Sequence, residues 1–200
     1  MRLALLFLFM AISYKYIQAD DIPPCLLLPG SLQTFLVSNG IMGNYTYKQA
    51  IQINAFVNLI VQTAKGSTGL ISICNTFQTL YTDMGRSYEK CMNPLAVFGM
   101  GDTTISNSRL FVYIFRKLQF MCGPGFNVWT PNKDCVYKAD TAVKQTCYGE
   151  NAQNFLSCLG QTYSNYCNSQ SIVGWFGCEK ERLGWIADCL TLSCSSIPNT

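Results

Sequence analysis

Eleven cysteines are the feature that most limits what this 200-residue chain can fold into. They follow residue 24 and lie at Cys25, Cys74, Cys91, Cys122, Cys135, Cys147, Cys158, Cys167, Cys178, Cys189 and Cys194. So many thiols are typical of proteins that fold in an oxidising compartment, where most cysteines form disulfides. Structural zinc is the other common use of cysteines, but the chain has no Cys-x-x-Cys pair and no histidine. The sequence therefore predicts a covalently cross-linked fold.

The spacing of the cysteines predicts that the disulfides join different helices. Three successive pairs are eleven residues apart: Cys147 and Cys158, Cys167 and Cys178, and Cys178 and Cys189. Eleven residues make about three helical turns, so two such sulfurs on one helix would be roughly 16 Å apart. That separation is too large for a disulfide, and we expect each of these cysteines to bond to a neighbouring helix instead.

An odd number of cysteines leaves at least one thiol without an intramolecular partner. Cys25 is the candidate, because 49 residues separate it from Cys74 while the later cysteines follow one another at intervals of 5 to 31 residues. The other ten are then the predicted disulfide cysteines, and Cys25 would allow a disulfide-linked homodimer. Alternatively, Cys25 attaches the N-terminal segment to the domain and the unpaired cysteine lies elsewhere.

The first nineteen residues have the layout of a secretory signal peptide. Arg2 precedes an uninterrupted apolar run over residues 3–12, and small residues follow it. The run is shorter than the ~20 apolar residues that span a bilayer. Cleavage fits after Ala19 or, alternatively, after Ser13. We therefore expect a secreted, extracellular protein with no membrane span and no lipid anchor or retention signal.

Apolar residues recur at helical spacing through most of the remaining chain, which predicts an all-α fold. The expected helices cover about residues 46–65, 67–92, 106–122, 130–147, 152–167 and 171–189. Gly85 is expected to bend the second of them, and Asn93-Pro94 to end it. Thr46 and Gln49 have the spacing of a capping box. Ser106 or Ser108 is expected to cap the third helix, and Pro131 to occupy the first position of the fourth.

These elements predict a disulfide-stapled, irregular helical bundle of about five or six helices with an extended N-terminal arm. Prolines in Pro23-Pro24 and Pro29-Gly30 disfavour regular structure in that arm. The expected segments are a signal peptide at 1–19, the arm at 20–45, a single cysteine-rich helical domain at 46–194 and a C-terminal tail at 195–200.

Charge and composition exclude several classes of function. The chain has no histidine, which excludes Ser-His-Asp and Cys-His catalysis and histidine-ligated zinc. Without residues 1–19 the chain has twelve basic and eleven acidic residues, so it lacks the excess of positive charge that is typical of nucleic-acid-binding proteins. A solvated helix face explains Arg116-Lys117, and Glu179 and Glu181 are expected on another, with Arg182 outward beside them. We expect no catalytic residue, cofactor or metal, and therefore no enzyme.

Aromatic residues and one glycosylation motif complete the candidate sites. Most of the aromatic rings are expected to be part of the core, with Trp185 or Ile186 facing inward from the last helix, and Trp129, in a loop after Gly125, is the best candidate among the tryptophans for exposure. Asn44-Tyr45-Thr46 is the one Asn-x-Ser/Thr sequon in the chain, which makes Asn44 a candidate for a glycan.

A run of cysteines with short apolar flanks resembles a known family. Ile73-Cys74, Tyr88 to Met92 and Leu118 to Cys122, followed by Cys135, Cys147 and Cys158, are similar to nematode secreted cysteine-rich domains of the chondroitin proteoglycan 4 type. The related nematode twelve-cysteine extracellular domain of unknown function is similarly close. The resemblance covers about residues 70–160 and implies a matrix- or eggshell-associated protein without enzymatic activity. Ser-Gly, the dipeptide used for chondroitin attachment, does not occur in this sequence.

Two functions follow from these observations. The first is a secreted extracellular structural or interaction protein, including one associated with matrix, whose partner is a protein or a glycan. The alternative is a helical carrier of a small hydrophobic ligand, because amphipathic helices held by disulfides can enclose a cavity. Hydrolysis by a carboxylate pair is a third and weaker hypothesis.

Overall fold

The computed structural model describes residues 25–63, 68–147, 151–185 and 191–194. Within these ranges the chain forms nine α-helices, one 3-10 helix and no strand. The elements are α2 (Leu28–Ser38), η1 (Tyr47–Gln49), α3 (Ala50–Thr63), α4 (Thr68–Met84), α5 (Ser87–Cys91), α6 (Pro94–Phe98), α7 (Ile105–Met121), α8 (Phe126–Thr146), α9 (Ala152–Tyr166) and α10 (Ser171–Trp185). The predicted all-α, disulfide-stapled fold is confirmed, with more helices than expected. The predicted signal peptide 1–19 and tail 195–200 lie outside the described residues.

Helix α2 forms where the sequence predicted an extended arm, so that prediction is wrong over Leu28–Ser38. Pro29 lies in the first turn of α2, where the missing N–H costs no helical hydrogen bond. The buried side chains of Leu28, Leu32 and Phe35 recur at helical spacing and belong to the main core. The folded domain therefore begins before residue 46.

The second predicted helix is divided into α4, α5 and α6. Gly85 has φ +50°, a left-handed conformation that ends α4 and that glycine adopts without strain. Asn93 then caps α6, because its side chain accepts a hydrogen bond from the backbone N–H of Leu95 at 2.9 Å. Pro94 occupies the first turn of α6. The predicted bend at Gly85 and the predicted stop at Asn93-Pro94 are both confirmed.

Helix caps were predicted with mixed success. The capping box of Thr46 and Gln49 is present, and the backbone N–H of Thr46 donates to Gln49 Oε1 at 2.8 Å. Thr104, rather than Ser106 or Ser108, caps α7 by accepting a hydrogen bond from the backbone N–H of Asn107 at 3.1 Å. Ser108 lies one turn inside α7 and is buried, with its hydroxyl bonded to the backbone of Thr104.

Helix α8 begins at Phe126, five residues before Pro131, which contradicts the predicted start. Pro131 lies inside the helix, where it removes one backbone hydrogen bond. The side chains of Thr130 and Asn132 donate to the backbone carbonyls of Phe126 and Val128 in the preceding turn. Because residue 129 is helical and faces the core, Trp129 is buried, like many of the aromatic rings, although the sequence made it the best candidate among the tryptophans for exposure.

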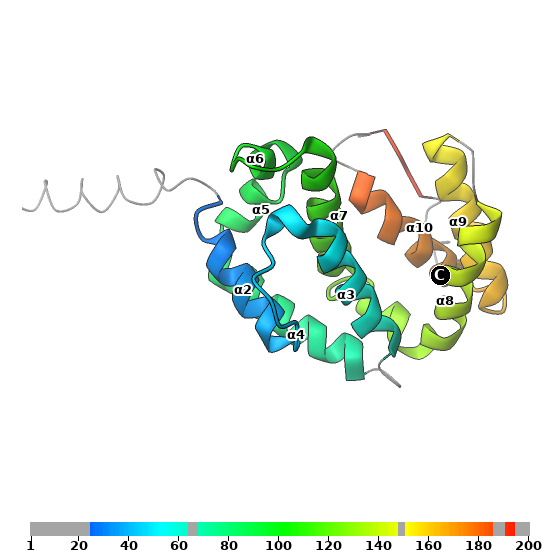
Figure 1. Cartoon of the computed structure of the whole chain (residues 1–200). Helices are drawn as coiled ribbons and strands as arrows, with labels where there is room; N and C mark the ends of the chain where they lie inside the picture. Colours follow the sequence, from blue (N-terminus) through cyan, green and yellow to red (C-terminus); the bar gives the residue numbers. More distant parts are fainter. Residues whose placement is uncertain (1–24, 64–67, 148–150, 186–190, 195–200) are drawn as a thin grey trace, which may run out of the picture.

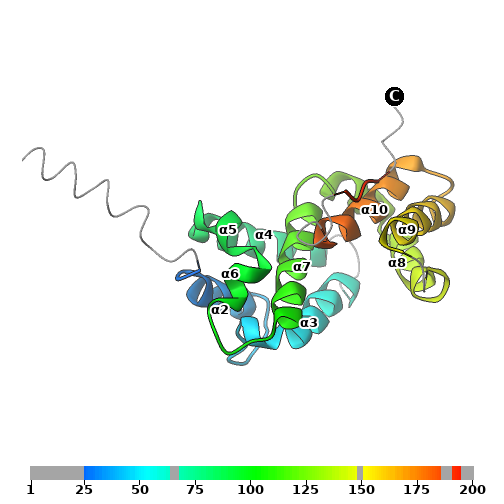
Figure 2. The same cartoon turned by 90° about the horizontal axis from the view of Figure 1, so that it is seen from above.

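Helix α7 is the central element of the molecule. In both views, α2, α4, α5 and α6 lie on one side of α7, and α8, α9 and α10 lie on the other (Figures 1 and 2). Phe120 of α7 packs against Trp175 and Phe176 of α10, with ring centroids 5.6 Å apart in each pair. One hydrophobic core includes residues from both sides, from Leu28 to Phe176. Within the described part of the chain, no helix is long and apolar enough to cross a membrane.

Five disulfides join different elements of the fold. They are Cys25–Cys91, Cys74–Cys122, Cys135–Cys167, Cys147–Cys158 and Cys178–Cys194. Two lie within residues 25–122 and three within residues 135–194, so none of the five crosses between the two sides of α7. Contact between the two sides therefore depends on side-chain packing, chiefly of α7 against α10.

The structure corrects two predictions about the cysteines. Cys25 bonds to Cys91 and attaches the segment before α2 to the end of α5, as the alternative interpretation stated. Cys147 and Cys158 bond to each other despite their spacing of eleven, because Cys147 follows the end of α8 and Cys158 lies in α9. Cys189, the one cysteine left after these five pairs, lies outside the described residues.

Candidate functional site

Four charged side chains, one of them buried and three partly exposed, meet where α7, α8, α9 and α10 converge. They are Lys117 of α7, Asp140 of α8, and Lys180 and Glu181 of α10, joined by Tyr113 of α7 and Tyr163 of α9. We call these six residues the ion cluster. Tyr113 and Lys117 share one face of α7 because they are four residues apart. The cluster links the helices on both sides of the α7–α10 contact.

Lys180 is the most buried charge in the cluster, with 2% of the residue exposed. Its ammonium donates to Asp140 Oδ1 and to the Tyr163 hydroxyl, both at 2.5 Å. It also lies 4.8 Å from the centre of the Tyr163 ring. Tyr163 in turn donates to Asp140. A buried charge needs both an opposite charge and hydrogen bonds, and Lys180 has both.

Glu181 anchors the other half of the cluster. Its carboxylate accepts hydrogen bonds from the Tyr113 hydroxyl and, at 3.3 Å, from the Lys117 ammonium. The ammonium of Lys180 lies 3.9 Å from Glu181 Oε1 and connects the two halves.

The sequence prediction placed Glu181 and Lys117 on solvated faces, and the structure contradicts it for both, because α7 packs directly on α10. Glu179 and Arg182 pair with each other at 2.7 Å. Arg116, next to Lys117, instead pairs with Glu89 at 2.5 Å, near the surface.

All four charged groups of the cluster are held in their ionised forms. Burial alone would raise the pKa of Asp140 and Glu181, but the ammonium groups of Lys117 and Lys180 hold both below their usual values. Burial would likewise lower the pKa of the two lysines, and the carboxylates hold it above the usual value. The charges sum to zero.

The tyrosines of the cluster are hydrogen-bond donors. Burial raises the pKa of Tyr163, and the carboxylates of Asp140 and Glu181 raise it further. Tyr113 is shifted upward by burial and by Glu181 in the same way. Both phenols therefore stay protonated and donate to carboxylates.

Close helix approaches hold the cluster together. A Cβ on Gly184 of α10 would lie 1.7 Å from Cδ2 of Tyr113, so only glycine lets α10 come so close to the Tyr113 ring. A Cβ on Gly174 would lie 2.6 Å from the backbone oxygen of Gly160, which brings α9 and α10 together in the same way. Two disulfides, Cys135–Cys167 and Cys147–Cys158, join α8 to α9 on either side of Asp140.

A cavity of about 290 Å³ borders the cluster, between α3 on one side and α8 and α9 on the other. Lys117, Asp140 and Glu181 line it, together with Lys144 at the exposed end of α8. A smaller cavity of about 40 Å³ shares Lys117 and Asp140 with it. A cavity lined by charged groups suits a ligand with polar groups rather than one that is apolar throughout.

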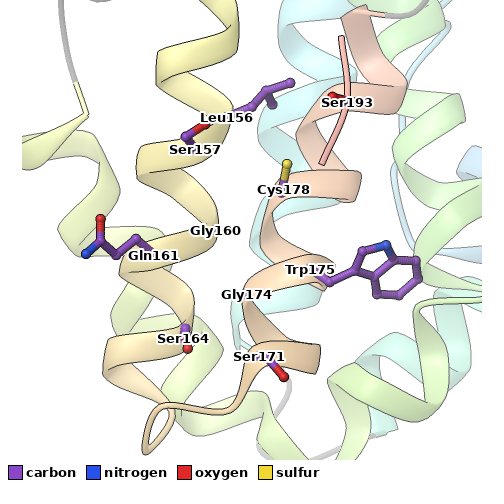
Figure 3. Close-up of a pocket in the computed structure, with 10 residues that line it drawn as sticks. All are labelled: Leu156, Ser157, Gly160, Gln161, Ser164, Ser171, Gly174, Trp175, Cys178 and Ser193. Atoms are coloured by element: carbon purple, nitrogen blue, oxygen red, sulfur yellow. The ribbon is translucent and has the colours of Figure 1, made fainter. Parts of the chain in front are cut away.

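A second hollow, of about 420 Å³, lies between α9 and α10 (Figure 3). Gly160 and Gly174 border it, with serine side chains from both helices, and no charged residue lines it. The Trp175 indole points away from α9 in Figure 3 and packs on Phe120 of α7. Gln161 points outward. Because the Trp175 indole is turned away and no charged residue lines the groove, it offers a ligand fewer specific contacts than the cavity beside the ion cluster does.

The arrangement of the ion cluster is not that of a general acid and base. Asp140 and Glu181 are both ionised and ion-paired, whereas an acid catalyst needs a carboxyl group with a raised pKa. Across the described residues, no group of three or more histidine, cysteine, aspartate or glutamate side chains can hold a metal ion.

The residues predicted as sites lie away from the ion cluster, apart from the disulfide of Cys147, which borders the cavity. The structure pairs every predicted disulfide cysteine among the described residues, Cys91 with Cys25. Asn44 is exposed in the loop between α2 and η1, where a glycan is sterically accessible. The side chain of Trp185 lies outside the described part.

Sequence reasoning missed the cluster itself. One signal was available: Lys180 continues the apolar stripe of Val173 and Phe176 at helical spacing, which marks a charge on a buried face.

No protein-family model matches the chain, and neither a curated protein nor a solved structure shows significant similarity to it. The resemblance to nematode cysteine-rich domains therefore stays a prediction.

Proposed function

We propose that this chain is a secreted extracellular interaction protein without catalytic activity. The observation that supports secretion best is the set of five disulfides, which join helices throughout the described chain. Disulfides persist in secreted proteins and are rare in the cytosol. The apolar run over residues 3–12 agrees with this route.

A binding role is favoured over an enzymatic one by the protonation states of the ion cluster. The carboxylates of Asp140 and Glu181 are ionised, and the phenols of Tyr113 and Tyr163 are protonated. Such groups can stabilise the fold and bind a partner, but they do not gain or lose a proton near neutral pH, as an acid or base catalyst must. The partner is an extracellular protein or glycan, in keeping with the matrix association that the resemblance to nematode cysteine-rich domains implies.

Carriage of a small ligand is the second candidate, and the cavity beside the ion cluster favours it. A ligand that is apolar throughout would bury Lys117 and Asp140 without giving them new partners, which is unfavourable. We therefore revise the expected cargo from a hydrophobic ligand to a small ligand with charged groups.

The proposal is tested by expressing the full chain in cultured eukaryotic cells and analysing the medium. We expect the protein in the medium, beginning at Asp20, with the five disulfides above in a non-reducing peptide map. A glycosidase should reduce its mass, and Asn44→Gln should abolish that reduction. Retention in the cytosol with free thiols would overturn the proposal.

The same material tests dimerisation. Ten described cysteines are paired, so a disulfide-linked homodimer requires Cys189. A dimer on non-reducing electrophoresis that Cys189→Ser converts to a monomer supports this arrangement. A monomer under both reducing and non-reducing conditions rejects it.

A further inference from the structure

The cavity beside the ion cluster has cationic groups with hydrogen-bonding capacity to spare. The ammonium of Lys117 bonds to Glu181 at 3.3 Å and to the Tyr113 hydroxyl at 3.5 Å, both long contacts. An ammonium has three donors, so at least one is available to the cavity. Lys144 is exposed at the cavity edge, and none of the described residues forms an ion pair with it.

An anionic group is available on the same cavity wall. Asp140 receives both of its hydrogen bonds, from Lys180 and Tyr163, at Oδ1. Its side chain is 34% exposed and borders both cavities, so Oδ2 can accept a hydrogen bond from a ligand. Lys180 is 2% exposed and borders only the smaller cavity, so its part in the larger one is to orient Asp140.

The remaining wall limits the size and shape of a ligand. Val143, Phe155 and Leu159 supply an apolar surface, and the amides of Asn54 and Asn58 of α3 face it across the cavity. The volume of about 290 Å³ lies just below the ~300–1,000 Å³ range of ligand sites. A ligand that fits is therefore small.

We propose that this cavity binds a small zwitterion of amino-acid size, which carries an ammonium, a carboxylate and an apolar body. The ligand's ammonium bonds to Asp140, its carboxylate to Lys117 and Lys144, and its apolar body packs on Phe155 and Leu159. The cavity presents two positive and two negative side chains, which matches a ligand with both charges and no net charge. This inference rests on the proposed role as a binding protein.

Three probes that share a phenyl ring test the contributions of the ligand's ammonium and carboxylate to binding separately. L-phenylalanine has both charged groups, 3-phenylpropanoate lacks the ammonium, and 2-phenylethylamine lacks the carboxylate. Isothermal titration calorimetry of the secreted, disulfide-bonded protein should give a lower Kd for L-phenylalanine than for either single-charge probe. Equal Kd values for the three probes, binding of only one single-charge probe, or no binding at millimolar concentrations would each overturn the proposal.

Two variants assign the charges to residues. Lys144→Gln should raise the Kd of L-phenylalanine and 3-phenylpropanoate by about two- to fivefold, the range of an exposed ion pair, and leave 2-phenylethylamine unchanged. Lys138→Gln is the matched control, because Lys138 is exposed on α8 but does not line the cavity. Asp140→Asn should raise the Kd of the two probes that carry an ammonium, L-phenylalanine and 2-phenylethylamine.

Lys144 is at the surface, so its variant folds even if Asp140→Asn does not. If the Lys144→Gln variant binds L-phenylalanine with the same Kd as the Lys138→Gln control, the proposed orientation of the ligand is contradicted. Secretion and disulfide pairing are measured on the same preparation, so failure of zwitterion binding leaves the broader function to be judged separately.

Discussion

Lys180 shows how one residue can make a helical interior depend on charge. Its neighbours within the core include the rings of Tyr163 and Phe176, and without Asp140 and Tyr163 its ammonium, at 2% exposure, would keep only the 3.9 Å contact with Glu181. Removing one member of a buried ion pair costs more than replacing both, because the remaining charge is left uncompensated. The ion cluster is therefore sensitive to single substitutions.

Lys180→Met tests this dependence. It leaves Asp140 with Tyr163 as its nearest donor, and we expect the free energy of unfolding to fall by about 3 kcal/mol, the lower end for buried pairs since Asp140 is partly exposed. Urea denaturation with the disulfides intact measures it. Lys138→Met, on the exposed face of α8, should change stability by less than about 0.5 kcal/mol. Equal effects of the two substitutions would contradict the role of Lys180.

Gly184→Ala tests the close approach of α10 to α7. The added Cβ would lie 1.7 Å from the Tyr113 ring and must displace it from Glu181. We expect a loss of about 1–3 kcal/mol, the usual cost of overpacking, in thermal denaturation followed by circular dichroism. Gly30→Ala is the control, because its Cβ meets no atom within 4 Å in α2 and alanine favours a helix. A Gly184→Ala protein as stable as the Gly30→Ala protein would disprove the packing argument.

At the scale of elements, the α8–α9 pair forms a cross-linked wall for the cavity. Cys135–Cys167 and Cys147–Cys158 hold the two helices together on either side of Asp140 and Tyr163. A side chain on this wall keeps its position relative to the other helix even when neighbouring elements move. Such rigidity is useful in a binding site, because the ligand does not have to order the helices.

The disulfides should differ in their contribution to stability. Cys25–Cys91 spans 66 residues and Cys147–Cys158 spans 11. In the chain-entropy description, these crosslinks stabilise by about 4 and about 3 kcal/mol respectively. We expect the Cys25→Ser/Cys91→Ser protein to unfold at a lower urea concentration than the Cys147→Ser/Cys158→Ser protein. The opposite order would mean that local packing, rather than loop length, dominates.

At the scale of the whole molecule, two disulfide-bonded sides meet along α7 and α10. Phe120, Trp175 and Phe176 supply apolar contact, and the ion cluster supplies charge pairing across the same contact. Since none of the five described disulfides crosses it, this contact depends on noncovalent interactions. Its stability should therefore depend on pH.

The pKa shifts define the pH range of that dependence. The folded-state pKa values of Asp140 and Glu181 lie below the usual 3.8 and 4.5, so their stabilisation is present above these values and lost as pH falls through the folded pKa. Lys117 and Lys180 are shifted above 10.5, so their stabilisation is present below 10.5 and lost as pH rises through the folded pKa.

We expect the urea midpoint of unfolding to be constant between about pH 5 and pH 10 and to fall on either side. Measuring the urea midpoint within this range and at lower and higher pH, in buffers of constant ionic strength, checks the expectation. A titration step between about pH 6 and pH 8 would contradict it, because no group in the cluster changes protonation there and the chain has no histidine.

The residues that report on local structure were interpreted correctly from the sequence in several cases. The capping box of Thr46 and Gln49, the bend at Gly85 and the stop at Asn93 depend on a few neighbouring residues, so the signal is in the sequence. Cysteine number and the absence of histidine are likewise properties of the sequence, and they predicted disulfides and excluded histidine chemistry.

The sequence by itself determined that the chain is helical, that its helices are stapled and where several of them end, because hydrogen bonding and dihedral preference within a turn control these features. Only the tertiary structure decided that Cys25 bonds to Cys91, that α2 forms within the predicted arm, and that Lys180 is buried and Glu181 half-buried. Each of these depends on which distant segment packs alongside. The cavity arises in the same way, because α3 packs on α7, α8 packs on α10, and the contact of α7 with α10 places α3 and α8 on opposite walls of the cavity.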